Sequence, residues 1–155
     1  MRIRNRMMAA MGFAAAITVN AGGGSGARDG LAEFEIAGDA IAAPLAGLTG
    51  DAAHGLAIIR DRTLGNCLIC HALPLPDELF QGEIGPPLGG VGSRLSPGQI
   101  RLRLVDQSRI NPNTLMPSYY RVDGLTNVAP EYMGRPALDA QQVEDVIIYL
   151  AGLKE

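Results

Sequence analysis

Five residues constrain this chain more than any other part of its sequence: Cys67-Leu68-Ile69-Cys70-His71, a C-x-x-C-H motif that contains both cysteines and one of the two histidines. This spacing is the pattern for attachment of a c-type haem. Two thiols three positions apart near the end of a helix can each form a thioether with one vinyl group of the same porphyrin. The histidine that follows then falls under the iron as an axial ligand. The motif therefore predicts one covalently bound haem c and one-electron chemistry.

Other uses of the two cysteines fit the sequence less well. A zinc site needs four ligands, and the only other candidate of the usual type is His54. A thioredoxin-like dithiol would need a βαβ pattern around it, which the chain lacks. A disulfide across so short a loop would stabilise the fold little through chain entropy. Haem attachment is thus the preferred interpretation, with a redox dithiol as the main alternative.

Residues 1–21 have the pattern of a secretory signal peptide. Three arginines lie within the first six residues, an apolar stretch covers residues 7–19, and the small residue Ala21 stands at the expected cleavage point. The apolar stretch is too short to span a membrane. Because bacterial c-type cytochromes are matured outside the cytoplasm, we expect a periplasmic mature protein with no membrane-spanning segment.

The composition of the remaining chain bounds its size and its partners. Cleavage after Ala21 would leave 134 residues, a natural length for one domain, with ten basic and sixteen acidic residues. This negative balance argues against a nucleic-acid partner and favours a partner with a basic docking surface. A buried porphyrin would contribute to the core of such a glycine- and proline-rich chain, at about 25 cal/mol per Å² of apolar surface removed from water.

The sequence predicts short helices joined by long loops, without a run of alternating strands. Residues 22–50 form a glycine-rich start and an extension that we expect to lie over the surface of the core, so that the main domain spans residues 51–155. Asp51 is expected to cap a helix that runs into the C-x-x-C-H motif. A second helix, capped by Ser96, should end near Ser108.

The last predicted helix has the clearest signals. Asp139 and Gln142 form a capping box ahead of an apolar face at helical spacing, made of Val143, Val146, Ile147, Leu150 and Leu153. The first predicted helix, the C-x-x-C-H motif and this last helix together resemble the class I cytochrome c plan. That plan is an all-α fold of short helices and long loops around one haem. In that plan the last helix crosses the first, here at Gly55 or Leu56. Close approach would explain a glycine within a helix, which otherwise costs about 1 kcal/mol; the alternative is that Gly55 is merely tolerated.

The second axial ligand must come from a short list. Outside the first 21 residues the methionines are Met116 and Met133. Met116 precedes Pro117 in a loop that resembles the Met-Pro loop of class I cytochromes, where a methionine sulfur raises the reduction potential of the iron. Met133 lacks that context, and His54 lies on the proximal side. We expect His71 and Met116 to be the axial ligands, with Met133, His54 or an open position as alternatives.

Two further residues follow from the class I resemblance. Gly85-Pro86-Pro87-Leu88 is similar to a G-P-x-L segment of that class, which implies that the carbonyl of Pro86 accepts a hydrogen bond from His71. A plain proline turn is the alternative. Arg94 is a candidate contact for a haem propionate, although a solvated surface arginine would look the same.

A narrower resemblance, to the SoxX cytochromes of bacterial thiosulfate oxidation, covers most of residues 35–155. It rests chiefly on residues 111–122, which include the block Met-Pro-Ser-Tyr-Tyr-Arg. The likeness extends to residues 38–45 upstream of the motif and to residues 123–125, 128–132, 134–138 and 141–145. The class I motifs are generic, whereas this block with its continuation is much more specific.

The SoxX resemblance implies a subunit role. Such proteins pair with a SoxA-like c-type cytochrome in the periplasmic SoxAX heterodimer, which couples thiosulfate oxidatively to a cysteine of the SoxYZ carrier protein. The bond-forming haem of this L-cysteine S-thiosulfotransferase complex belongs to the SoxA-like subunit. This chain would be its non-catalytic partner, which takes up the released electrons and passes them to a small cytochrome c. Both cysteines would be consumed by thioethers, so no free thiol would remain to carry sulfur.

Two other functions stay open at the level of sequence. One is a diffusible monohaem carrier without a dedicated partner, and the other is a haem-free thiol oxidoreductase. Residues 31–50 and 119–136 are extra to a minimal cytochrome. They could form a partner interface or simply cover the haem.

Overall fold

The computed structural model describes residues 31–155, so the predicted signal peptide and the glycine-rich start lie outside the described residues. The described part is all-α, as expected, with an isolated bridge between Ala37 and Ala40 as its only β pairing. Its elements are η1 (Leu45–Gly47), α1 (Ala52–Arg60), η2 (Cys67–Ile69), α2 (Val91–Arg94), α3 (Pro97–Asp106), η3 (Gln107–Arg109), η4 (Pro130–Tyr132) and α4 (Ala140–Gly152), where η denotes a 3-10 turn. Among residues 31–155 no helix has the length and apolar character needed to cross a membrane.

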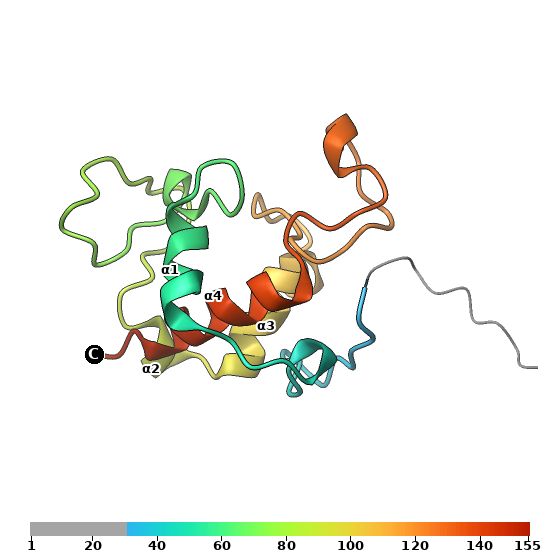
Figure 1. Ribbon diagram of the computed structural model, residues 1–155, viewed down its shortest axis with the longest axis horizontal. Coiled ribbons are helices and arrows are strands. Elements are labelled where there is room, and N and C mark those ends of the chain that lie inside the picture. The colour runs from blue at the N-terminus through green and yellow to red at the C-terminus, as the bar shows by residue number, and fades with distance from the viewer. Residues whose placement is uncertain (1–30) are drawn as a thin grey trace, which may run out of the picture.

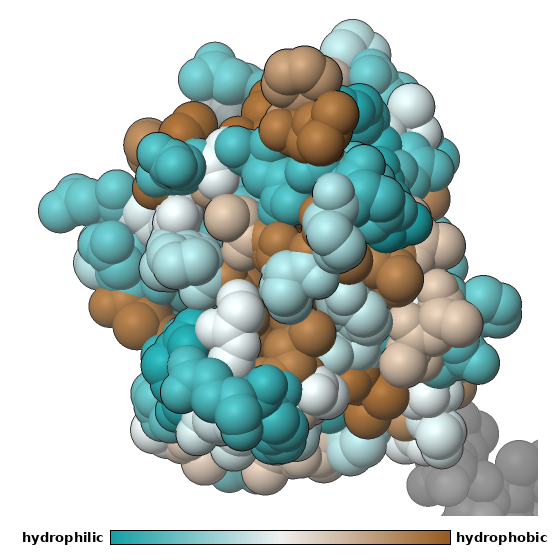
Figure 2. Space-filling model, turned by 90° about the vertical axis from the view of Figure 1, so that its left-hand side faces the viewer, coloured by the Kyte–Doolittle hydropathy of each residue, from teal (hydrophilic) through white to brown (hydrophobic). Residues whose placement is uncertain are grey.

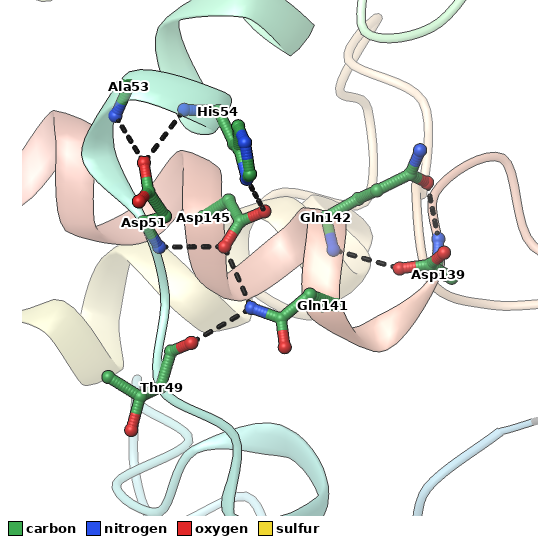
Figure 3. Close-up of polar contacts among 8 residues, drawn as sticks. All are labelled: Thr49, Asp51, Ala53, His54, Asp139, Gln141, Gln142 and Asp145. Atoms are coloured by element: carbon green, nitrogen blue, oxygen red, sulfur yellow. Dashed lines mark hydrogen bonds and ion pairs between the residues drawn. The ribbon is translucent and has the colours of Figure 1, made fainter.

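Helix α4 lies at the centre of the fold, with α1 crossing it and α3 beside it (Figure 1). It begins as predicted, because Asp139 and Gln142 form a reciprocal capping box (Figure 3). Of its predicted apolar face, Val143, Val146, Ile147 and Leu150 are buried, while Leu153 lies just past the helix end and is partly buried.

Helices α1 and α4 approach each other most closely at a glycine. Gly55 is buried, and a Cβ at this position would lie 2.1 Å from the carbonyl oxygen of Asp145. The crossing predicted at Gly55 is therefore present. The buried carboxylate of Asp145 adds a polar link, because it accepts hydrogen bonds from the amide of Asp51 at 2.7 Å and from Gln141 Nε2 at 2.8 Å (Figure 3).

The expectation that the first helix runs into the C-x-x-C-H motif is wrong. Helix α1 is capped by Asp51 as predicted, but it ends at Arg60, and a turn of residues 61–66 separates it from the motif. The carboxylate of Asp61 accepts hydrogen bonds from the amide and the hydroxyl of Thr63, both at 2.7 Å. Such a local bond offers the backbone an alternative to the next helical turn. The turn closes at Asn66, whose φ of 46° is left-handed.

Helix α3 follows the sequence prediction closely. Ser96 and Gln99 form its capping box with Pro97 at the first helical position. The helix proper ends at Asp106, and the tighter turn η3 continues to Arg109, so the change of course falls where it was expected. Beyond α3 the chain forms a long excursion to α4, in which residues 121–136 project from the helices and contain η4 (Figure 1).

Residues 31–50 lie only partly over the surface. Most of their side chains are exposed, but Ile41 and Leu45 are buried in the core. A buried ion pair holds this segment: Arg101 Nε and Nη2 each donate to a carboxylate oxygen of Glu144 at 2.7 Å, with the two side chains only 3% and 2% exposed. Glu144 also accepts from the amide of Leu45, and Arg101 donates to the carbonyl of Ile41.

Candidate haem site

The C-x-x-C-H motif forms one tight turn. Residues Cys67–Ile69 are the 3-10 turn η2, and the amides of Cys70 and His71 donate to the carbonyl of Cys67 at 3.2 and 3.0 Å. The left-handed backbone of Asn66 starts this turn directly after the reversal that ends α1. The two thiols and the imidazole are thus carried by a single turn of backbone.

Both cysteines are free and partly buried. Burial raises the pKa of the Cys67 thiol to about 11. A reactive redox dithiol has the opposite property, a lowered pKa that maintains the thiolate near neutral pH. Burial thus disfavours the thiolate of Cys67, which counts against this sulfur as a redox nucleophile.

A second segment, residues 82–88, lies alongside the motif and runs in the same direction. Three main-chain hydrogen bonds of 2.8 Å join the two, from Gly82 to Leu68, from Gly85 to Cys70 and from Leu88 to Ala72. Gly82 permits this approach, since a Cβ there would lie 1.9 Å from the carbonyl oxygen of Ile69. The pairing fixes the position of Pro86 relative to His71.

His71 is oriented by this second segment. Its Nδ1 lies 2.8 Å from the carbonyl oxygen of Pro86. A carbonyl can only accept, so Nδ1 carries the proton, and in the neutral imidazole the lone pair is then on Nε2. This is the arrangement in which a histidine binds a metal through one nitrogen while a carbonyl holds the other.

Gly85 completes the cradle of His71, and the sequence analysis did not single it out as a site residue. A Cβ at residue 85 would lie 2.2 Å from Cε1 of the imidazole, so any other residue here would displace the ring from its present position. The signal was present in the Gly85-Pro86-Pro87-Leu88 segment, from which only Pro86 was assigned a role. The glycine and the proline carbonyl act on the same side chain from adjacent positions.

The surroundings of the motif suit a large apolar group. Six of the ten large apolar side chains that stay exposed in the described part come from the motif, its flanking segments and the methionine loop: Leu64, Ile69, Leu79, Phe80, Ile84 and Leu115. The loop after the motif lies on the left of Figure 1, and seen from that side apolar surface runs between polar side chains (Figure 2). Together with two thiols and a free imidazole nitrogen, these residues fit a covalently held porphyrin.

The three candidates for a second axial ligand differ in their surroundings. Met116 is partly buried and packs against the core, as Cys67 does. Met133 is 68% exposed on the projecting loop. His54 has a side chain that is 78% exposed, with Nδ1 4.0 Å from a carboxylate oxygen of Asp145 near the start of α1 (Figure 3).

Tyr119 ties the Met116 loop to the motif, and the sequence analysis assigned it no such role. Its hydroxyl donates to the carbonyl oxygen of Gly65 at 2.8 Å, two residues ahead of Cys67. Burial raises the pKa of this tyrosine, with the nearby Cys67 and Cys70 adding to the effect. The segment that follows Met116 is thereby joined to the turn that starts the motif, over 54 residues of sequence.

Arg94, at the end of α2, binds the protein's own backbone. Its guanidinium donates to the carbonyl oxygens of Gly89 at 2.7 Å and Pro87 at 3.1 Å, and it pairs with Glu155 at 3.2 Å. These contacts stabilise the chain just after Pro86. A contact between Arg94 and a propionate stays a prediction.

Among solved structures, the chain is similar to a chain of the crystal structure of SoxXA from P. pantotrophus, at 37% sequence identity with a TM-score of 0.73. The match covers 79% of this chain and 96% of the other one. No family model and no curated protein matches the sequence.

Proposed function

The chain belongs to the family of SoxXA chains, and we propose that within it this is the SoxX-type subunit, a periplasmic monohaem cytochrome that transfers electrons. The single observation that supports this most is the motif turn: two thiols next to an imidazole whose Nδ1 is held by Pro86, so that Nε2 is free for iron. Cys67 and Cys70 would hold one haem c by thioethers, and His71 would be its proximal ligand.

The chemistry that this haem supplies when bound is the uptake and release of one electron at the iron. The residues of the chain set the orientation and the basicity of the imidazole that would bind the iron. Pro86 and Gly85 fix the plane of His71, and the hydrogen bond that Nδ1–H donates to the Pro86 carbonyl makes the imidazole a more basic ligand.

Met116 is the distal ligand that the surroundings favour. It is the methionine that packs inward, in a loop that Tyr119 joins to the motif turn. The exposed Met133 and the Asp145-paired His54 lack both properties. A thioether on the distal side would raise the reduction potential and so suit an electron acceptor.

These assignments imply a division of labour with a partner. With both cysteines in thioethers and both axial positions filled, the chain offers neither a sulfur nucleophile nor an open iron site. The bond between thiosulfate and a cysteine of the SoxYZ carrier would form on a SoxA-like cytochrome, and this chain would accept the electrons and pass them to a small cytochrome c. The SoxAX heterodimer is thus the proposed working unit, after export by the signal peptide of residues 1–21.

Purification of the tagged full-length protein from the periplasm of its native host tests the proposal. We expect a red protein with one haem that survives denaturation, together with a second c-type cytochrome in equal amount. Thiosulfate and the carrier protein should then reduce this haem in the complex. The Cys67→Ala, Cys70→Ala double variant is the control. It should contain no covalently bound haem and show no thiosulfate-dependent reduction.

Each contrary outcome favours one of the other functions. A lone red monomer that thiosulfate does not reduce would contradict the subunit role and favour a diffusible carrier. A colourless protein with a reactive dithiol would contradict haem attachment altogether.

A further inference from the structure

Asp106 lies at the base of the loop that contains Met116. It is the last residue of α3, its side chain is 4% exposed, and the chain departs from it through η3 into residues 110–118. One carboxylate oxygen, Oδ1, accepts hydrogen bonds from both ends of the loop. On the outgoing side the donors are the amide of Ser108 at 3.2 Å and its hydroxyl at 2.5 Å, and on the returning side the donor is the hydroxyl of Ser118 at 2.8 Å.

The second oxygen of Asp106 faces two cations. Arg121 Nη1 donates to Oδ2 at 2.9 Å, and Arg109 Nε lies 3.3 Å from the same atom. Arg121 Nη1 also donates to the hydroxyl of Ser108 at 3.3 Å. A buried carboxylate is costly unless it is paired and hydrogen-bonded, and here both conditions are met by residues on the two sides of the loop.

After Ser118 the chain returns along α3 and is held there by backbone hydrogen bonds. The amides of Tyr119 and Tyr120 donate to the carbonyls of Leu104 and Val105 at 3.0 and 3.4 Å, which lays the chain along α3 after Ser118. Within the loop, the amide of Met116 donates to the hydroxyl of Thr114 at 3.1 Å, and the Met116 side chain packs against the core. The Ser108–Asp106–Ser118 bridge joins the two ends of the loop at its base through one carboxylate oxygen, and Arg121 adds to it by donating to both Asp106 and Ser108.

We propose that Asp106 is a positioning residue for Met116: by joining Ser108 to Ser118 it holds the loop closed, so that the methionine sulfur stays on the haem iron. The inference rests on the proposed role of Met116 as distal ligand. A thioether is a weak ligand, so its hold on the iron depends on how seldom the loop opens. The apparent affinity of the iron for a competing ligand then rises with the fraction of open loop.

The test uses the full-length holoprotein and imidazole as the competing ligand. The ferric form of wild type and of Asp106→Asn is titrated with imidazole while the sulfur–iron absorption band is followed. Asp106→Asn keeps the shape of the side chain but removes its charge, which weakens the hydrogen bonds from Ser108 and Ser118, so we expect the variant to need about tenfold less imidazole. Ser118→Ala removes one donor and keeps the carboxylate, and should shift the titration in the same direction by less.

Asp139→Ala is the control, because it removes the side-chain cap at the start of α4 and lowers stability without touching residues 106–118. It should leave the imidazole titration unchanged. Unchanged titrations in both Asp106→Asn and Ser118→Ala would overturn the proposal, as would an equal shift in Asp139→Ala. Failure of the ligand assignment looks different: the sulfur–iron band would then be missing in wild type or would survive Met116→Ala.

Discussion

Gly55 of α1 lies against the main chain of Asp145 in α4, so close that a Cβ on residue 55 would approach the Asp145 carbonyl oxygen to 2.1 Å. The two helices therefore meet through backbone at this point, without a side chain between them. Only the turn of residues 61–66 separates α1 from Cys67, so the position of α1 determines the position of Cys67. A structural contact far from the motif thus bears on the geometry of the site.

Gly55→Ala should destabilise the protein although alanine is the better helix former. The methyl group has no space against rigid backbone, so the helices must separate, and we expect the free energy of unfolding to fall by about 2–3 kcal/mol. Gly152→Ala is the matched control in α4, because nothing lies within 4 Å of a Cβ there. It should stay within about 1 kcal/mol of wild type. Chemical denaturation followed by circular dichroism measures both, and equal stabilities would contradict the close approach.

Gly85→Ala should disturb the proximal ligand specifically. The new methyl would lie 2.2 Å from the His71 ring, so the imidazole must turn and its bond to Pro86 is lost. We expect less haem-loaded protein and a low-spin spectrum that is partly replaced by a high-spin one. Gly89→Ala serves as control, since a Cβ there meets nothing within 4 Å. Identical absorption spectra for the two variants would refute the cradle.

Met116→Ala should abolish the sulfur–iron absorption band and lower the reduction potential. The reason is that a thioether stabilises the ferrous iron relative to a nitrogen ligand or water. Met133→Ala is the matched control, a methionine 68% exposed on a neighbouring loop, and should leave band and potential as in wild type. Optical titration of the two variants against redox dyes measures the potentials. If Met133→Ala removes the band instead, the distal assignment is wrong.

Local signals in the sequence predicted the helix starts well. Asp51, Ser96 and Asp139 all cap helices, because a cap depends on residues two or three positions away. The end of α1 was not predicted, although its cause is equally local. The hydrogen bonds between Asp61 and Thr63 form a turn that competes with the next turn of the helix. The crossing at Gly55 was predicted through a resemblance, which brought in the long-range geometry that a single helix pattern lacks.

Contacts between distant residues were the part that the sequence could not reveal. The Tyr119–Gly65 bond and the Arg101–Glu144 pair span 54 and 43 residues and follow no local period. Charged residues such as Arg101, Glu144 and Asp106 are ordinarily solvated, so their burial appears only once their partners are brought together. The burial of Ile41 and Leu45 was missed likewise, because residues 31–50 show no clean periodicity.

Arg101→Met should be among the most destabilising substitutions in the described core. It leaves Glu144 as a buried carboxylate without its cation. Removing one partner of a buried ion pair lowers the free energy of unfolding by about 3–5 kcal/mol. The segment around Ile41 and Leu45 should loosen with it, because it is bound to the same two side chains. Arg103→Met is the control on the same helix, with a weaker and more exposed pair to Asp39 at 3.7 Å. Urea denaturation measures both, and similar losses would contradict the special role of the buried pair.

Ionisation of Asp106 should contribute to the pH dependence of the free energy of unfolding. Burial alone would raise the pKa of its carboxyl, but hydrogen bonds from Ser108 and Ser118 and the charge of Arg121 outweigh it and lower the pKa below its usual 3.8. The unfolded state then binds the proton first as the pH falls, so this carboxylate stabilises the fold above about pH 4, and that contribution is lost as the pH drops through the lower folded value.

Wild type should therefore lose free energy of unfolding more steeply below pH 4 than Asp106→Asn, which has no such carboxyl. The comparison is needed because Asp51 and Asp61 also have lowered pKa values through their hydrogen bonds to local backbone and side chains, and these contribute equally to both proteins. Denaturant titrations at a series of pH values between 7 and 3 give the two slopes. Parallel slopes would mean that the pKa of Asp106 is the same in the folded and the unfolded chain, so that the bonds at the base of the Met116 loop do not favour its charged form.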